Sequence, residues 1–267
     1  MSVKADSCKG RKISRRQVDD YFKHALDRQS LKNKTIAVTG ANGALGRTAS
    51  LALAEIGATV VLIGRTLSEL EKVYDEIVSA GGAEPAIYPM HLDNLVESEY
   101  QKLADTLADE LGELDGLVIN AVYFDKLRPL AHTSVESLQK SLAVNVCSPF
   151  LLNKYLSPIM RRDSDCAMIA VMDAQESNRD AFWGSYKISK RGFEELWKIL
   201  ALESANNNFL SYCGFDPGPL NSALRARAYP AVNPAQFPHP HSAGQALATL
   251  CVGREIRGEF TDFSLVD

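Results

Sequence analysis

The sequence lacks any apolar run close to the roughly 20 residues that a helix needs to cross a bilayer, and its first residues are polar, unlike a secretory signal. Its five cysteines are scattered, without the paired spacing of a zinc site or a disulfide framework. The 267 residues, 46% of them hydrophobic, are enough for a well-buried core. We therefore expect a soluble cytoplasmic protein with reduced, mostly buried cysteines and no membrane partner.

Positive charge is concentrated at the start of the chain. Residues 1–33 hold nine Lys and Arg against four Asp and Glu, which leaves nine net negative charges for residues 34–267. Within this segment, the apolar residues of Ile13–Arg28 recur at helical spacing and predict a helix packed on the rest of the protein. A nucleic-acid-binding or transit role is the alternative, but interspersed aspartates favour a solvated basic face and no nucleic-acid partner. We predict a basic, partly helical extension over 1–33 and one domain over 34–267.

From Lys34 onward, short β-branched runs alternate with amphipathic stretches such as Leu67–Ser79 and Gly184–Ser204. This alternation predicts an α/β fold with a doubly wound parallel sheet, the Rossmann arrangement, because parallel strands need helical crossovers. The predicted strands are Thr35–Thr39, Thr59–Gly64, Ala86–His91, Gly116–Asn120, Ala167–Met172, Leu210–Gly214 and Glu259–Leu265.

A glycine-rich turn separates the first predicted strand from a helix beginning near Leu45. Gly40 permits a tight turn, and Gly46 allows the helix to pack closely on the strand while its N-terminal amides face a pyrophosphate. Such a turn is a weak signal by itself, but its position between strand and helix makes it a dinucleotide fingerprint. The residues predicted to contact the cofactor here are Gly40, Asn42, Gly43, Leu45 and Gly46.

This turn resembles the T-G-x-x-x-G-x-G pattern of the short-chain dehydrogenase/reductase family, with Ala44 where the family usually has its middle glycine. The second predicted strand ends at Gly64-Arg65, where a free ribose 2′-hydroxyl would need an acidic acceptor. Arg65 can instead bind a 2′-phosphate through its planar guanidinium, although it could also be an ordinary exposed arginine. We therefore expect NADP rather than NAD.

Tyr186 and Lys190 lie four residues apart in Tyr-Lys-Ile-Ser-Lys, hence on one face of a helix. A tyrosine has a pKa near 10, and a nearby ammonium lowers it toward the range useful for proton exchange. Tyr-x-x-x-Lys is common by chance, but here it follows a predicted strand and opens an amphipathic helix. In the family that the sequence resembles, Tyr186 would exchange the proton, and Lys190 would assist it and bind the nicotinamide ribose.

The resemblance assigns roles to further residues. It implies that Asn145 holds a proton-relay water, although a helix kink is the alternative. Asp93 would contact the adenine amino group, or cap the helix expected near Val96. Asn120, in the stretch that corresponds to the family's N-N-A-G, would lie in the cofactor floor.

The loop after the sixth predicted strand also matches the family. Pro217-Gly218, with Ser222 four residues after the glycine, is similar to the family's loop beneath the nicotinamide and pyrophosphate. An ordinary proline-glycine turn is the alternative. The resemblance therefore implies cofactor contacts from Pro217, Gly218 and Ser222.

Two departures from the family pattern bear on activity. Ile119 and Val122 replace one polar residue and one glycine of the N-N-A-G motif, which we expect to perturb the cofactor floor without abolishing the sheet. The family places a substrate-orienting serine 13 residues before the tyrosine, and that position is Asp173. A carboxylate accepts but cannot donate a hydrogen bond unless protonated, and it repels an oxyanion. Ser177 is too close to Tyr186 to substitute simply.

Two functions are consistent with these residues. The first is an NADPH-dependent oxidoreductase of a small carbonyl or alcohol, with Asp173 in an altered orienting role. The second is an NADP-binding protein with little turnover, a sensor or assembly partner. The apolar, proline-containing loop Leu220–Pro240 weakly favours a hydrophobic or aromatic substrate. The resemblance also implies a homodimer or homotetramer through helices around Ser134–Met160 and Gly184–Ser204, with Trp197, Leu200 and Leu202 as possible contacts.

Overall fold

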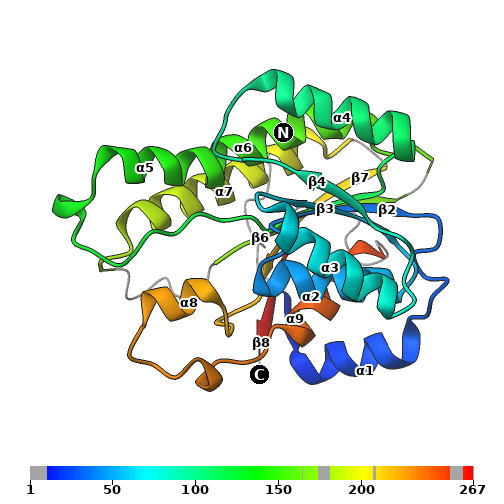
Figure 1. The fold of residues 1–267 in the computed structure, drawn as a ribbon, viewed down its shortest axis with the longest axis horizontal. Helices are drawn as coiled ribbons and strands as arrows, with labels where there is room; N and C mark the ends of the chain where they lie inside the picture. Colours follow the sequence, from blue (N-terminus) through cyan, green and yellow to red (C-terminus); the bar gives the residue numbers. More distant parts are fainter. Residues whose placement is uncertain (1–10, 164, 174–180, 207–208, 253–260, 267) are drawn as a thin grey trace, which may run out of the picture.

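The computed structural model describes residues 11–163, 165–173, 181–206, 209–252 and 261–266. They form three layers, with one parallel sheet between two layers of helices (Figure 1). The strand order is β1-β8-β7-β6-β5-β2-β3-β4. The strands are β1 (Arg11–Ser14), β2 (Thr35–Thr39), β3 (Thr59–Gly64), β4 (Ala86–Pro89), β5 (Gly116–Ile119), β6 (Cys166–Val171), β7 (Leu210–Asp216) and β8 (Thr261–Val266). This arrangement is the predicted doubly wound α/β fold.

The helices divide between the two faces of the sheet. One face carries α1 (Arg15–Ala25), α2 (Ala44–Glu55), α3 (Leu67–Ser79) and α9 (His241–Cys251). The other carries α4 (Glu97–Leu111), α5 (Val135–Leu142), α6 (Ser148–Leu156) and α7 (Gly184–Glu203). The short helix α8 (Ala223–Ala228) lies apart from both layers, below α5 and α7 in Figure 1.

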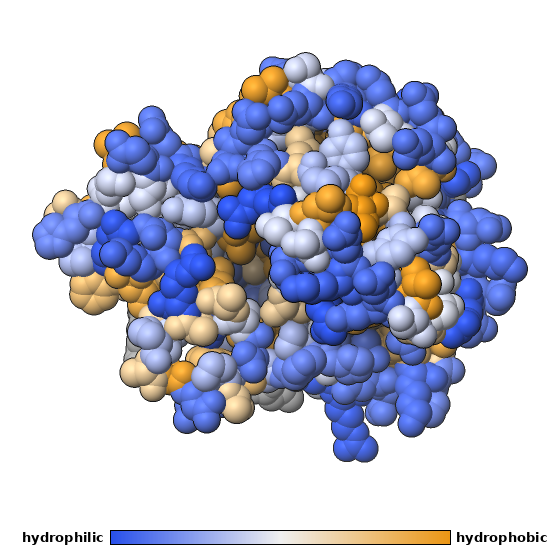
Figure 2. Space-filling model, in the orientation of Figure 1, coloured by the Kyte–Doolittle hydropathy of each residue, from blue (hydrophilic) through white to orange (hydrophobic). Residues whose placement is uncertain are grey.

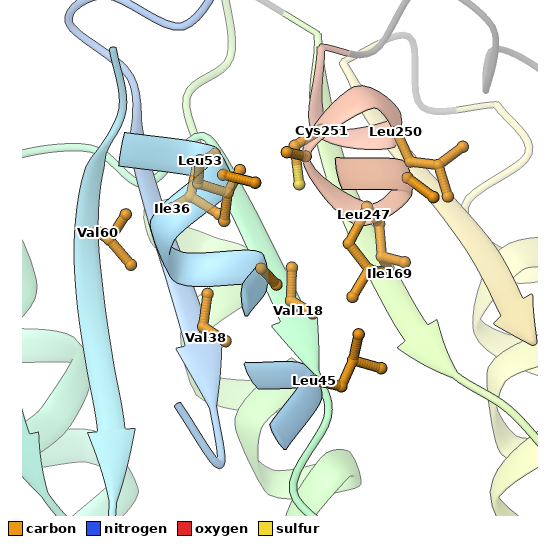
Figure 3. Packing of buried hydrophobic residues seen from close by; sticks show 14 of the residues in the cluster. Ile36, Val38, Leu45, Leu53, Val60, Val118, Ile169, Leu247, Leu250 and Cys251 are labelled. Atoms are coloured by element: carbon orange, nitrogen blue, oxygen red, sulfur yellow. The ribbon is translucent and has the colours of Figure 1, made fainter. Parts of the chain in front are cut away.

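The core on the α2 side shows why the sheet is so apolar. Ile36, Val38 and Val118 project from β2 and β5 toward Leu53 of α2 and Leu247 of α9 (Figure 3). These side chains are at most 1% exposed. Strands covered by helices on both faces need apolar residues throughout, and this need explains the continuous β-branched runs in the sequence.

The central elements match the prediction, and the edge strand β4 is shorter than predicted. Strands β2 and β3 and helix α3 have the predicted bounds. Strand β4 ends at Pro89 instead of His91, because its neighbour among the described strands, β3, ends at Gly64, which pairs with Pro89. Strand β7 continues two residues beyond the predicted end, to Asp216. The first two residues of the predicted Glu259–Leu265 strand lie outside the described residues, as does Ser177.

The N-terminal segment contributes a strand that the sequence reading missed. Residues 11–14 pair in parallel with β8, in a register that places Arg11 opposite Phe263. Helix α1 begins after Ser14, whose hydroxyl accepts from the amide of Gln17 in a capping box. Val18 and Phe22 are buried, and Phe22 belongs to the same core cluster as α2 and α9. Residues 11–25 thus pack on the sheet, and the helix predicted within Ile13–Arg28 is present as α1.

Trp197 belongs to the interior and is not a surface contact. Its side chain is fully buried and its Nε1 donates to the carbonyl of Cys213 over 3.0 Å. Leu202, by contrast, is 74% exposed. Of the four described cysteines, three are buried and all are free thiols. Among the described residues, no helix is long and apolar enough to span a bilayer.

Candidate active site

All of the predicted cofactor and catalytic residues except Gly46 and Asn145 line one cleft. After β4 the chain crosses back to place β5 beside β2, so the strand order reverses between these two strands. Ligands of open α/β sheets bind beyond the carboxyl ends of the strands at such a point. A cleft of about 530 Å³ lies there. The surface in Figure 2 is hollowed near the middle of the face, with hydrophobic side chains visible inside.

The glycine turn forms the cofactor end of the cleft. Gly40 has a φ of +63°, a backbone conformation that favours glycine. A Cβ on Gly46 would lie 2.1 Å from the carbonyl oxygen of Gly40, so the helix approaches the turn as closely as a glycine allows. No side chain of the described chain caps the first amides of α2, which open beside Gly43 onto the cleft. These amides and the glycine turn, in which Gly40 and Gly43 carry no side chain, can bind an anion by donating hydrogen bonds to it.

Arg65 and Asp93 lie at the same end of the cleft. Arg65 follows β3 and is exposed to solvent. Asp93 is half-buried and its Oδ2 lies 2.9 Å from the Nζ of Lys140, whose hydrogen bond holds the pKa of Asp93 below its usual value. The alternative helix-cap role for Asp93 is wrong, since α4 begins after Val96.

Asn120 ties β5 to the glycine turn. Its Nδ2 donates to the carbonyl oxygens of Thr39 and Gly40, both over 3.1 Å. The Thr39 hydroxyl accepts from the amides of Asn120 and Ala121 and donates to the carbonyl of Val118. The sequence reading missed this role of Thr39, although the residue stands first in the glycine motif. The network fixes the two strand ends that border the cleft.

Asn145 lies at a π-helical widening, Ala143–Cys147, between α5 and α6. The amide of Tyr123 donates to Asn145 Oδ1 over 2.7 Å, and Asn145 Nδ2 donates to the carbonyl of Tyr123 and to Ser189 Oγ. Short π-helical segments within α-helices often occur at functional sites. The asparagine therefore connects the loop after β5 with α7, the helix of Tyr186. Ser189 is a further site residue that the sequence reading did not identify.

The altered motif after β5 is accommodated without strain. Ile119 is buried in the core against the α4 and α6 side. Val122 lines the cleft, and its backbone lies outside the left-handed region where glycine would be required. Because Asn145 holds the next residue, Tyr123, at both its amide and its carbonyl, this loop is fixed by the asparagine.

Tyr186 faces the cleft from the first turn of α7. Its ring meets Phe124 edge-on, with centroids 5.5 Å apart, and lies 5.3 Å from the ring of Trp183. These three aromatic residues and Ala228 of α8 form a small buried cluster. The tyrosine ring is therefore held by packing on its apolar sides while the residue still lines the cleft.

Lys190 lies one helical turn after Tyr186 and also lines the cleft. Its ammonium donates to the carbonyl of Val171 over 2.6 Å. Burial lowers the pKa of Lys190 to about 8, while the carboxylates of Asp173 and Asp216 oppose that shift. The lysine thus changes charge close to neutral pH, which suits a group that assists proton exchange.

Asp173 lines the cleft just after β6, and Lys187 is its partner. The Nζ of Lys187 lies 4.0 Å from Asp173 Oδ1, and the two side chains are 11% and 19% exposed. A buried ammonium is costly without an opposite charge nearby. The sequence reading identified Asp173 and missed Lys187, because nothing in the sequence shows that this lysine is buried.

The turn after β7 forms part of the wall of the cleft. Asp216 is buried and its Oδ1 accepts from the amide of Gly218, which has a φ of +66°. Ser222 caps α8 by accepting from the amide of Arg225. Arg15, from the N-terminal segment, donates to the carbonyl of Pro217 over 3.1 Å. The first strand-helix unit of the chain therefore supports the predicted cofactor loop.

A family model and solved structures agree with this geometry. The model described as short chain dehydrogenase matches residues 34–233. The uncharacterized oxidoreductase YciK of Escherichia coli strain K12 is 29% identical over 218 residues, which are 81% of this chain and 86% of YciK. A solved structure from Pseudomonas syringae, assigned to the short chain dehydrogenases, is 33% identical with a TM-score of 0.84, over 90% of this chain and 97% of that chain.

A second solved structure contains a cofactor. It comes from Shigella flexneri 2a strain 301, is also assigned to the short chain dehydrogenases and is complexed with NADP. It is 26% identical with a TM-score of 0.83, over 90% of this chain and 99% of that chain. Together, the family model, these relatives and the cleft at the sheet's switch point show that the chain belongs to the short chain dehydrogenase family of oxidoreductases.

Proposed function

We propose that the protein is an NADP-dependent oxidoreductase that interconverts a small carbonyl compound and its alcohol. The observation that carries this proposal is that Tyr186, Lys190 and the glycine turn all line one cleft. A catalytic tyrosine beside a lysine with a pKa of about 8 and an anion-binding helix terminus are the parts that such a reaction needs. The NADP complex of the related Shigella flexneri protein supports the choice of cofactor.

The residues of the cleft fit a dinucleotide. The bare turn around Gly43 and the uncapped amides of α2 suit the pyrophosphate. Arg65 would bind the ribose 2′-phosphate and Asp93 the adenine amino group, while Pro217, Gly218 and Ser222 would lie beneath the nicotinamide. Bound there, the cofactor would supply or accept the hydride.

The protein itself would manage the proton and the position of the substrate. Tyr186 would donate a proton to the substrate oxygen in reduction and accept it in oxidation. Lys190 would favour the charged form of the tyrosine and bind the nicotinamide ribose. Asn145 would keep α7 and the loop after β5 in register, because it bonds to Ser189 and to Tyr123.

Asp173 would occupy the position of the family's serine, with consequences for substrate orientation. Its carboxylate is paired with Lys187, so it is placed to accept a hydrogen bond from the substrate rather than to donate one. Orientation of the carbonyl would then depend mainly on Tyr186. This pair is also the observation that favours a second function, an NADP-binding protein with little turnover, because an anion near the reacting oxygen disfavours an oxyanion.

A cofactor-consumption screen tests the proposal. Oxidation of NADPH is followed at pH 7 with panels of aldehydes, ketones, diketones and quinones, and reduction of NADP⁺ with the matching alcohols. Turnover of at least one compound supports the enzyme. Tight NADPH binding without turnover across every panel supports the binding protein instead.

The helices through which the family resemblance implies pairing leave apolar side chains exposed. Phe150 on α6 and Ile188, Ile199 and Leu202 on α7 are each at least 45% exposed. We propose a homodimer or homotetramer formed through these helices. Light scattering at micromolar concentration tests it, and a monomer would contradict it.

A further inference from the structure

The substrate end of the cleft carries a cation that the predicted mechanism does not use. Arg227 of α8 lines the cleft and its Nη1 donates to the carbonyl of Phe124 over 2.9 Å. The ring of Phe124 lies 5.5 Å from that of Tyr186. Phe124 therefore contacts both Arg227, through its carbonyl, and Tyr186, through its ring.

Arg227 keeps most of its hydrogen-bonding capacity. A guanidinium has five N–H donors, and the bond to Phe124 uses a donor of Nη1. The ion pairs within the described part of the chain involve other arginines, such as Arg47, Arg128 and Arg191, and none includes Arg227. A planar guanidinium that is fixed through one nitrogen still has N–H donors on its other nitrogens. Their arrangement matches the two oxygens of a carboxylate.

A second arginine adds positive charge at this end. Arg225 also lines the cleft and is 8% exposed. Its guanidinium lies 5.6 Å from the ring of Tyr229 and 5.4 Å from the ring of Phe237, so aromatic side chains hold it in place. Arg225 and Arg227 therefore both lie where α8 borders the cleft.

The reacting end carries a carboxylate. Asp173 lies on the cleft wall after β6, in the same cleft that Tyr186 and Lys190 line. Lys187 is paired with Asp173, and Lys190 donates to the carbonyl of Val171, so both cations at this end already have a partner and neither favours a substrate carboxylate next to the reacting carbonyl. Phe124 and Leu224, which line the cleft and pack in the aromatic cluster, provide an apolar wall. An apolar body therefore fits between the reacting end and the arginines of α8.

We propose that Arg227, with Arg225 beside it, binds a carboxylate of the substrate, and that the preferred substrate is an aromatic carbonyl compound whose carboxylate is remote from the carbonyl. This inference rests on the proposed oxidoreductase function and specifies its substrate class. Attraction at α8 orients such a molecule with its carboxylate toward Arg227 and its carbonyl toward Tyr186.

Three aldehydes or keto acids of similar size separate the possibilities. Initial rates of NADPH oxidation are compared for 4-carboxybenzaldehyde, its methyl ester and phenylglyoxylate, whose carboxylate adjoins the carbonyl. A charge-assisted contact predicts a kcat/KM about 10- to 100-fold higher for 4-carboxybenzaldehyde than for the ester. Phenylglyoxylate should be the poorest of the three.

Variants test the assignment to Arg227. In Arg227→Met, the kcat/KM values for the acid and the ester should differ by no more than about threefold. Arg227→Lys keeps the charge but not the planar set of donors, and should give an intermediate ratio of kcat/KM values. Arg191→Met is the control, since Arg191 lies on α7 in an ion pair with Glu194 and does not line the cleft. It should leave the ratio unchanged.

Binding is measured separately from turnover. Calorimetry compares 4-(hydroxymethyl)benzoate with benzyl alcohol, with and without NADP⁺. If no aldehyde is reduced but the anion binds and Arg227→Met removes that binding, the proposed function fails and the carboxylate site stands. If the acid and the ester are reduced equally well, the carboxylate site is overturned and the oxidoreductase stands. Absence of both turnover and anion-selective binding overturns the carboxylate site.

Discussion

The Nζ of Lys187 lies 4.0 Å from the Oδ1 of Asp173, and both side chains are largely withdrawn from water. Each charge reduces the cost of burying the other. The lysine follows Tyr186 directly in the sequence, while the aspartate follows β6. The pair therefore joins the start of α7 to β6, the strand that ends at the cleft.

This pair predicts non-additive effects on stability. Asp173→Ser and Lys187→Met should each lower the free energy of unfolding by roughly 1–3 kcal/mol, because each leaves a buried charge without this partner. The double variant should lose clearly less than the sum of the two losses. Urea denaturation of the four proteins measures this coupling. Strictly additive losses would show that the two charges do not stabilise each other.

Cofactor choice is predicted from Arg65. Arg65→Ala should weaken NADPH binding about 10- to 100-fold and leave NADH binding almost unchanged, since only NADPH carries the 2′-phosphate. Fluorescence titration of both cofactors measures this, with Arg191→Met as a control for the loss of a surface arginine. Equal weakening of both cofactors would place Arg65 away from the 2′-phosphate.

Close packing at Gly46 predicts a sharp cost for one added methyl group. In Gly46→Ala the new Cβ would lie 2.1 Å from the Gly40 carbonyl oxygen, a backbone atom, so the turn must move. We expect a loss of stability of roughly 1–3 kcal/mol and weaker NADPH binding. Gly192→Ala is the matched control, because that helical glycine meets only a Val146 side chain, at 3.4 Å. Similar stability for the two variants would refute the close approach.

Burial of Lys190 predicts a dependence of stability on pH. Burial lowers the pKa of Lys190 in the folded protein to about 8, against an ordinary value of 10.5. Below pH 8 Lys190 is protonated in both the folded and the unfolded protein, and burying its charge lowers the free energy of unfolding by roughly 3 kcal/mol. Between pH 8 and about 10.5 the folded protein has released the Lys190 proton while the unfolded protein still binds it. The stability of the wild-type protein therefore rises with pH relative to that of Lys190→Met. The measurement is the difference in unfolding free energy between the two proteins at several pH values, and a constant difference would contradict the shift.

The parts of the fold predicted from sequence are those fixed by local pattern. Strands β2 and β3 are largely buried runs rich in β-branched residues, and the glycine turn follows β2 directly, so local sequence was sufficient to predict them. Strand β1 has a single apolar residue, Ile13, and forms because its backbone pairs with β8 at the other end of the chain. No local pattern contains that information.

The site was predictable to the same extent. Tyr186, Lys190 and Asn145 could be proposed from the sequence because each lies in a short stretch that matches a family motif. Lys187 and Arg15 were missed, since their roles depend on Asp173 and Pro217, which are distant in sequence and close only after folding. Asp173 was found only because it departs from the motif.

We expect Tyr186 to exchange a proton with the substrate in an NADPH-dependent reaction. Steady-state NADPH oxidation is measured for the wild-type protein and Tyr186→Phe, using the best substrate of the carbonyl screen, with NADPH binding titrated for both. We expect Tyr186→Phe to lose at least about 100-fold in kcat, the contribution typical of general acid catalysis, while NADPH affinity changes less than about threefold. Turnover by Tyr186→Phe at the wild-type rate would contradict the assignment of the active site.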